Sequence, residues 1–314
     1  MVKKKSTSMD EFEIPNGCVL GPVEEWVEPG ASLWGESEFL PRVPDLDEIR
    51  DAVDDAGILF KPPAPGSKEE KIEIEELIDL SQLRDDPHAL YSSERGRERR
   101  AISRFLQLRP QPYGAAHNMD VPPTEPAVRT GRELARWFES ETPGLAERLA
   151  LNYLLPRSGF KPPRQARVWC ALDCAIYGAL LGAWWYKWQD PRTKCRHRPV
   201  QADPRVSVLY NFEANATFSG DGELRKKPSP SPGTPRHPAF PAGHSTVAGA
   251  GLGILSYFFP DLTSEFEDMA DNAGMARLWA GIHFRSDHIF GINLGKVIAG
   301  LVVARLVKDG VDKK

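Results

Sequence analysis

Apolar residues recur at helical spacing through most of the second half of the chain. Two amphipathic segments come first, one ending before Pro143 and the next at Pro156. The apolar positions that mark them are Leu134, Trp137 and Phe138, then Leu145, Leu149 and Leu154. The run from Ala166 to Lys187 is apolar on most sides, as a helix at the centre of a bundle is. Further helices are predicted over 245–259, about 263–281 and 287–308.

The first half of the chain carries a weaker pattern. Residues 1–45 are rich in proline, glycine and acid, which predicts an extended N-terminal arm, and residues 46–314 are expected to form one helical domain. A short capped helix is predicted from Asp45 to Val53, and a helix of mixed apolar period from Lys68 to Leu83. Between Asp190 and Pro241 the chain is polar and proline-rich, and within this stretch residues 228–232 are expected to form a loop or a lid.

Composition narrows the class of protein. The 314 residues are 41% apolar, enough for a core, and the net charge of −4 with a pI near 6.0 argues against nucleic-acid binding. The charge cluster at 93–100 interleaves acid with base, so a solvated helix face is the better interpretation. The first residues lack the apolar run of a secretory signal, and no uninterrupted apolar run has membrane-spanning length. These features predict a cytoplasmic protein with no membrane span.

The four cysteines show no zinc-like spacing. Cys170 and Cys174 are four residues apart in a helical pattern, where two small core residues are expected rather than a disulfide or a metal site.

Candidate chemistry centres on the segment from Pro241 to Thr246, which opens the predicted helix at 245–259. Gly243 and His244 would lie at the start of this helix, where free N–H groups and the positive end of the dipole favour an anion. A histidine there could also supply or accept a proton. The segment therefore predicts an oxyanion pocket with an acid/base histidine, and the alternative is a capping loop with a structural histidine.

Two further segments carry groups that suit an oxyanion. Arg277, His283 and Asp287 would converge if one helix ends near Gly281 and another begins after Ser286, giving an arginine fork, an imidazole and a carboxylate that orients it. Lys187 ends the central helix and Arg198 follows, adding positive charge. The neighbouring basic residues are expected to form a surface loop; they are Arg192, Lys194 and Arg196.

In their order along the chain, these motifs resemble the three signatures of a known superfamily. It joins type 2 phosphatidic acid phosphatases, bacterial acid phosphatases and vanadium-dependent haloperoxidases. The residues around the motifs, with Trp184 three residues before Lys187, are more similar to those of the soluble haloperoxidase branch. The match is specific from about 170 to 300 and diffuse before that. The resemblance implies an all-α helical bundle with an anion held between helices.

The resemblance also implies a role for each matched residue. His283 would be the ligand of vanadate or the nucleophile toward phosphate, Asp287 would orient it, and His244 would be the acid/base. The groups that would bind the equatorial oxygens are Lys187, Arg198, Arg277 and the N–H of Gly243.

Two departures from the family pattern matter. Ala242 stands where the family has serine, and Arg198 follows Lys187 by eleven positions, where family spacing is seven. Arg196 is therefore kept as the alternative to Arg198.

Three functions remain open at this point. The first is a vanadate-dependent haloperoxidase that oxidises halide with hydrogen peroxide, which the motif surroundings and His237 favour. The second is a vanadium-free phosphatase that hydrolyses a small phosphoester through a phosphohistidine. The two share a pocket because vanadate resembles the phosphoryl transition state. The third is a degenerate anion-binding helical protein. A homo-oligomer is a further possibility.

Overall fold

The computed structural model describes most of the chain from residue 42 to residue 309. The described residues are 42–58, 61–91, 102–108, 128–139, 143–209, 217–218, 224–225, 234–235 and 237–309. The predicted arm at 1–45, apart from its last four residues, lies outside this set, as do the charge cluster at 93–100 and the proline-rich stretch at 228–232.

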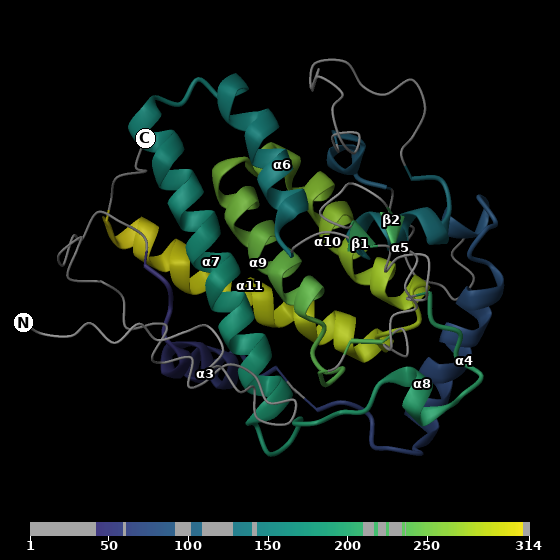
Figure 1. Cartoon of the computed structure of the whole chain (residues 1–314). Coiled ribbons are helices and arrows are strands. Elements are labelled where there is room, and N and C mark those ends of the chain that lie inside the picture. The colour runs from purple at the N-terminus through teal and green to yellow at the C-terminus, as the bar shows by residue number, and fades with distance from the viewer. Residues whose placement is uncertain are drawn as a thin grey trace, which may run out of the picture.

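Helices form most of the described structure, as the hydrophobic pattern predicts (Figure 1). The α-helices are α3 (Leu46–Asp55), α4 (Lys68–Gln82), α5 (Gly131–Glu139), α6 (Leu145–Leu154), α7 (Pro162–Trp188), α8 (Pro199–Ala202), α9 (Gly243–Phe258), α10 (Thr263–Trp279) and α11 (Arg285–Asp309). Short 3₁₀ helices are η2 (Ala89–Tyr91), η3 (Arg104–Leu108), η4 (Leu155–Arg157) and η5 (Pro260–Leu262). Two short strands, β1 (Thr217–Phe218) and β2 (Leu224–Arg225), pair antiparallel. The predicted all-α class is confirmed.

Helix α9 lies at the centre, between α7, α10 and α11 (Figure 1). Its glycines and alanines allow close approach of a neighbour: a Cβ on Gly249 would lie 2.3 Å from the carbonyl oxygen of Ile292 on α11. On the opposite side of the same contact, a Cβ on Gly295 would lie 2.1 Å from the carbonyl oxygen of Thr246. This close packing holds the start of α9 against the start of α11.

The first two of the described helices, α3 and α4, begin with side-chain caps. Asp45 accepts from the N–H of Glu48 while the Glu48 side chain accepts from the N–H of Asp45, a capping box that starts α3. Ser67 accepts from the N–H of Glu70 at the start of α4. Helix α4 lies beside α8 at the edge of the bundle (Figure 1). It packs against α10.

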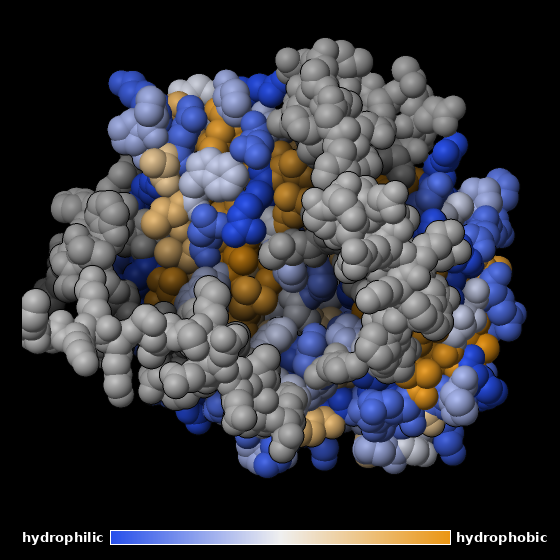
Figure 2. Space-filling view, in the orientation of Figure 1, coloured by the Kyte–Doolittle hydropathy of each residue, from blue (hydrophilic) through white to orange (hydrophobic). Residues whose placement is uncertain are grey.

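Within the part of the chain that the structure describes, two helices are long and apolar enough to cross a membrane by length and composition, namely Pro162–Trp188 and Arg285–Lys308. Core helices of soluble proteins pass the same test, so the expected absence of a membrane span stays a prediction. On the face in Figure 2, hydrophilic residues lie beside bands of apolar ones. Cys170 and Cys174 lie partly buried on α7, and Cys174 packs against the core.

Candidate active site

His283 lies in the short turn between α10 and α11 and is 3% exposed. Gly281 opens the turn with φ of 74°, in the left-handed region that favours glycine. The N–H of Ile282 then donates to the carbonyl oxygen of Arg277. The imidazole that follows has a different partner at each nitrogen: Nδ1 lies 3.1 Å from Oδ2 of Asp287, and Nε2 lies 3.1 Å from Nη1 of Arg198.

These two contacts determine which ring nitrogen carries the proton. Arginine can only donate, so Nε2 of His283 accepts from Arg198 and the proton lies on Nδ1, which donates to Asp287. Burial holds the pKa of His283 well below its usual value, and the charge of the Arg198 guanidinium lowers it further. Asp287 opposes this shift of the pKa. The imidazole is therefore neutral, with a lone pair on Nε2.

Asp287 is fully buried and ionised. Its Oδ1 accepts from Nη1 of Arg196 at 2.6 Å, and its Oδ2 also accepts from the N–H of Phe284 at 2.9 Å. Burial alone would raise the pKa of Asp287, but Arg196, His283 and the Phe284 N–H hold it well below its usual value. An ionised carboxylate fixed in this way keeps the Nδ1 proton of His283 in place.

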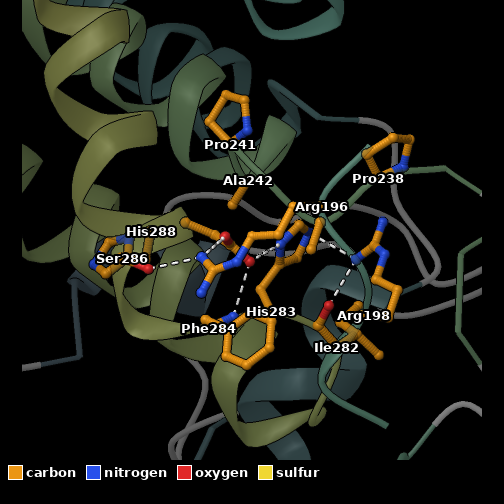
Figure 3. Close-up of polar contacts among 12 residues, drawn as sticks. Arg196, Arg198, Pro238, Pro241, Ala242, Ile282, His283, Phe284, Ser286 and His288 are labelled. Carbon is orange, nitrogen blue, oxygen red and sulfur yellow. Dashed lines mark hydrogen bonds and ion pairs between the residues drawn. The ribbon is translucent and has the colours of Figure 1, made fainter. Parts of the chain in front are cut away.

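The two candidate arginines take different positions. Figure 3 shows the Arg196 and Arg198 guanidinium groups on opposite sides of the His283 ring. Arg198 contacts Nε2 and also donates to the carbonyl oxygens of Ile282 and His237, at 2.6 and 2.9 Å. Arg196 pairs with Asp287 on the Nδ1 side. The position beside the reactive nitrogen therefore belongs to Arg198.

The expectation that Arg196 belongs to a basic surface loop is wrong. Its side chain is 4% exposed and its guanidinium lies 4.0 Å from the ring centroid of Phe284. Buried carboxylates draw it inward, which the sequence spacing could not show. The side chain of Arg192 is 53% exposed and Lys194 is exposed, so for these two residues the expectation is confirmed.

Lys187 is fully buried at the end of α7 and braces the segment before α9. Its Nζ contacts the carbonyl oxygens of Pro238 at 2.7 Å, Ala239 at 3.2 Å and Pro241. Burial, then the nearby Arg198, lowers its pKa well below the usual value. Three carbonyl acceptors nevertheless match the three hydrogens of an ammonium group.

The long spacing between Lys187 and Arg198 is accommodated by a compact turn. The chain folds back so that the N–H of Cys195 donates to the carbonyl oxygen of Lys187 at 2.8 Å. Cys195 takes φ of 62° to do so, and the buried Asp190 accepts from the N–H of Arg192. The extra residues therefore leave both cations in the same region of the fold.

His237 and Trp184 form a wall on the Arg198 side of the site. The two rings lie 5.1 Å apart, and Nδ1 of His237 lies 3.1 Å from Nη2 of Arg198. Burial, then the charges of Lys187 and Arg198, lowers the pKa of His237 to about 3. A Cβ on Gly243 would lie 3.5 Å from Trp184, so the first residue of α9 borders the same wall.

His244 and Arg277 occupy the helix ends that the sequence predicts. His244 is the second residue of α9 and is partly buried. Arg277 lies in the last turn of α10, is 1% exposed, and donates to the carbonyl oxygen of Ala135 at 3.2 Å. The N–H of Ala242 donates to the carbonyl oxygen of Asp287 at 3.0 Å, which joins the start of α9 directly to the His283 motif.

Hydrogen bonds connect three of the seven predicted site residues, Arg198, His283 and Asp287. Lys187 lies next to them, because it contacts the carbonyl oxygen of Pro238 while Arg198 contacts that of the preceding His237. Gly243 joins them through Trp184. For His244 and Arg277 the structure shows the helix on which each residue lies and how far each is buried. Sequence reasoning missed Glu73 on α4, which contacts both Arg196 and Ser286.

A family model matches the segment that holds most of this geometry. It describes the PAP2 superfamily and covers residues 196–310. Residues 196–310 are a PAP2 superfamily domain. Glu73 and Lys187 lie before this domain.

Two kinds of known protein are similar to part of this chain. A vanadium-dependent bromoperoxidase of Corallina officinalis is 30% identical over a match that covers 21% of this chain and 16% of that protein. A lipid A 1-phosphatase of Rhizobium etli is 36% identical over 21% of this chain and 30% of that protein. The matches thus span less than a third of either relative.

A solved structure shares the fold beyond the PAP2 domain. It is the homohexameric vanadate-dependent bromoperoxidase AnII of Ascophyllum nodosum, at a TM-score of 0.53 and 16% identity. The likeness covers 88% of this chain and 73% of that one. The helical architecture is therefore that of a vanadium haloperoxidase.

Proposed function

We propose that this protein is a vanadate-dependent haloperoxidase in which Nε2 of His283 binds the vanadium. The observation that carries the proposal is the neutral imidazole with its proton on Nδ1, which leaves the Nε2 lone pair beside Arg198. A neutral imidazole is a good ligand, and its partner at the other nitrogen is a carboxylate, as at many histidine–metal sites.

The remaining groups fit a multiply charged oxyanion. Arg198 offers a guanidinium at Nε2 of His283, and Lys187 and Arg277 are buried basic residues at the ends of α7 and α10. The N–H of Gly243 opens α9, where the helix dipole favours negative charge. Vanadate held there would supply the Lewis-acid chemistry that activates hydrogen peroxide.

The residues of the chain would move the proton and place the halide. The overall reaction converts halide, hydrogen peroxide and one proton into hypohalous acid and water: the halide loses two electrons and the O–O bond is reduced. His244, at the start of α9, is placed to deliver that proton. Ring edges carry partial positive charge, so the wall of Trp184 and His237 suits a halide anion.

A phosphatase is the alternative function. The lipid A 1-phosphatase relative and the absence of a hydroxyl at Ala242 favour it, since one fewer donor weakens activation of a bound oxidant. In that reaction Nε2 of His283 would attack phosphorus, the P–O bond would break, and the leaving alkoxide would take a proton from His244. Water would then hydrolyse the phosphohistidine.

A degenerate anion-binding protein is the third possibility. Two departures from the family pattern support it, namely Ala242 and the long spacing from Lys187 to Arg198. The turn closed by the Cys195 N–H removes the second of these supports.

Parallel assays of the purified protein separate the three functions. Bromide and iodide oxidation with hydrogen peroxide is measured with and without orthovanadate, and hydrolysis of a chromogenic phosphoester is measured without it. Halide oxidation that requires vanadate and is suppressed by phosphate supports the haloperoxidase. Phosphoester hydrolysis without halide oxidation assigns the phosphatase, and neither activity, with anion binding retained, assigns the degenerate protein.

A further inference from the structure

Helix α4 presents a row of glutamates to the back of the site. Glu70, Glu73 and Glu76 recur every three residues and so share one helix face. Glu70 lies 2.8 Å from Nε2 of His197, and Glu76 pairs with Arg285 at 2.7 Å. Glu73, between them, is 8% exposed and contacts two segments at once.

The contacts of Glu73 reach both Arg196 and the start of α11. Its Oε2 accepts from Nη2 of Arg196 and from Oγ of Ser286, each at 3.0 Å, and its Oε1 accepts from the N–H of Ser286. Ser286 is the residue before Asp287 and lies in the first turn of α11. One carboxylate therefore ties down the helix start from which Asp287 projects.

Arg196 continues the chain of contacts toward the imidazole. Its Nη1 donates to Ser286 at 2.7 Å and to Asp287 at 2.6 Å, while Nη2 is held by Glu73. Figure 3 shows Arg196 reaching Ser286 on this side of His283. The path runs from Glu73 through Arg196 to Asp287, and from Asp287 to Nδ1 of His283.

We propose that Glu73 is a positioning residue that fixes Arg196 and the start of α11, so that Asp287 holds the Nδ1 proton of His283. The proposal deepens the oxyanion-binding function and rests on it. It places one supporting residue of the site on α4, outside the PAP2 domain at 196–310. Outer partners of this kind alter affinity or activity by roughly 10–100-fold when they are removed.

Three variants test the role. Glu73→Ala removes every contact, and Glu73→Gln keeps an acceptor for Ser286 but loses the ion pair with Arg196. The matched control is Glu75→Ala on the same helix, because Glu75 pairs with Arg205 at the surface with side chains 53% and 61% exposed. Thermal unfolding establishes that each variant is folded, and Glu73→Gln carries the test if Glu73→Ala does not fold.

Two measurements are made on each variant. The tautomer of His283 is read without any anion from the ¹⁵N shifts of labelled histidines, with His283→Gln assigning its signal among the seven. The Kd for orthovanadate is measured by calorimetry. We expect wild type and Glu75→Ala to show the Nδ1–H tautomer. Glu73→Ala should show mixed tautomers and a Kd about 10–100-fold higher, with Glu73→Gln in between.

The two readouts distinguish the two proposals. A wild-type protein that binds neither orthovanadate nor phosphate would refute the oxyanion site, and the tautomer comparison alone would then decide the role of Glu73. Folded Glu73→Ala and Glu73→Gln proteins with the wild-type tautomer would overturn the positioning role. If the wild-type protein binds vanadate, an unchanged Kd for vanadate in the Glu73 variants would also overturn the positioning role.

Discussion

At the scale of single residues, the site depends on a neutral imidazole between a carboxylate and a guanidinium. His283 is 3% exposed and its two ring nitrogens contact Asp287 and Arg198. Because the guanidinium can only donate, the tautomer follows from the contacts without any assumption about the bound anion.

The two histidines of the motifs should fail in different ways. His283→Ala removes the proposed bond to the anion, so orthovanadate binding and turnover should both be lost. His244→Ala should leave binding largely intact and lower kcat by roughly 10²–10⁴-fold, the usual contribution of a general acid or base. Calorimetry with orthovanadate and steady-state kinetics measure the two effects, and an equal loss of binding in both variants would contradict the assignment.

His237 should make the fold sensitive to acid. Its pKa in the fold is about 3, and its ordinary value is near 6.5, so its neutral form is favoured by the fold. The associated stability is complete above about pH 6.5 and is lost as the pH falls toward 3, by up to about 1.4 kcal/mol per pH unit. In urea unfolding between pH 7 and pH 4, His237→Phe should show a shallower loss of stability than wild type. If the free energy of unfolding depended on pH in the same way in both proteins, the lowered pKa of His237 would be refuted.

Sequence reasoning named the residues of this site but not all of their contacts. His283, Asp287 and Arg198 could be assigned from spacing and from the resemblance, because each lies in a motif. The basic segment around Arg196 predicts a surface loop, and the sequence spacing does not show the partners that bury it. Its partners, Glu73 and Asp287, are 123 and 91 positions away, and only the fold brings them together.

At the scale of elements, the close contact of α9 with α11 positions the site. The helix that begins with Gly243 and His244 packs through small residues on the helix that presents Asp287, and the Ala242 N–H bonds directly to the Asp287 carbonyl.

Gly295→Ala should therefore destabilise the protein. The added Cβ would lie 2.1 Å from the carbonyl oxygen of Thr246 and 2.5 Å from the nitrogen of Ala250, both backbone atoms that no rotamer change can move away. We expect a loss of roughly 1–3 kcal/mol in the free energy of unfolding, as for other overpacked cores.

Gly300→Ala on the same helix is the control. Nothing lies within 4 Å of its Cβ position, so the variant should gain about 0.5–1 kcal/mol from helix propensity. Urea unfolding compares the two, and similar effects from both substitutions would contradict the close contact.

The long helices were predictable because their apolar patterns are strong. The run predicted from Ala166 to Lys187 is helix Pro162–Trp188, and those predicted at 245–259, about 263–281 and 287–308 are Gly243–Phe258, Thr263–Trp279 and Arg285–Asp309. Helix α4 had a mixed period because Glu70 and Glu73 are buried on the same helix as Ile74 and Leu77. Buried glutamates break the hydrophobic pattern, and three side chains that contact them lie far along the chain, namely Arg196, His197 and Ser286.

At the scale of the whole molecule, the site draws on more of the chain than the PAP2 domain. Lys187 ends α7 and Glu73 lies on α4, both before residue 196, while Arg198, His283 and Asp287 lie within 196–310. Helices α7 and α11 pack on the central α9, and α4 packs on α10 at the edge of the bundle (Figure 1). We propose that the residues on these segments form one oxyanion site, with Nε2 of His283 as its ligand.

A crystal structure of the protein soaked with orthovanadate is the most direct test of this oxyanion site. We predict vanadium bonded to Nε2 of His283, with the Arg198 guanidinium and the Gly243 N–H on its oxygens and His244 facing the same anion. Vanadate bound elsewhere, or His244 and His283 facing separate cavities, would contradict the account.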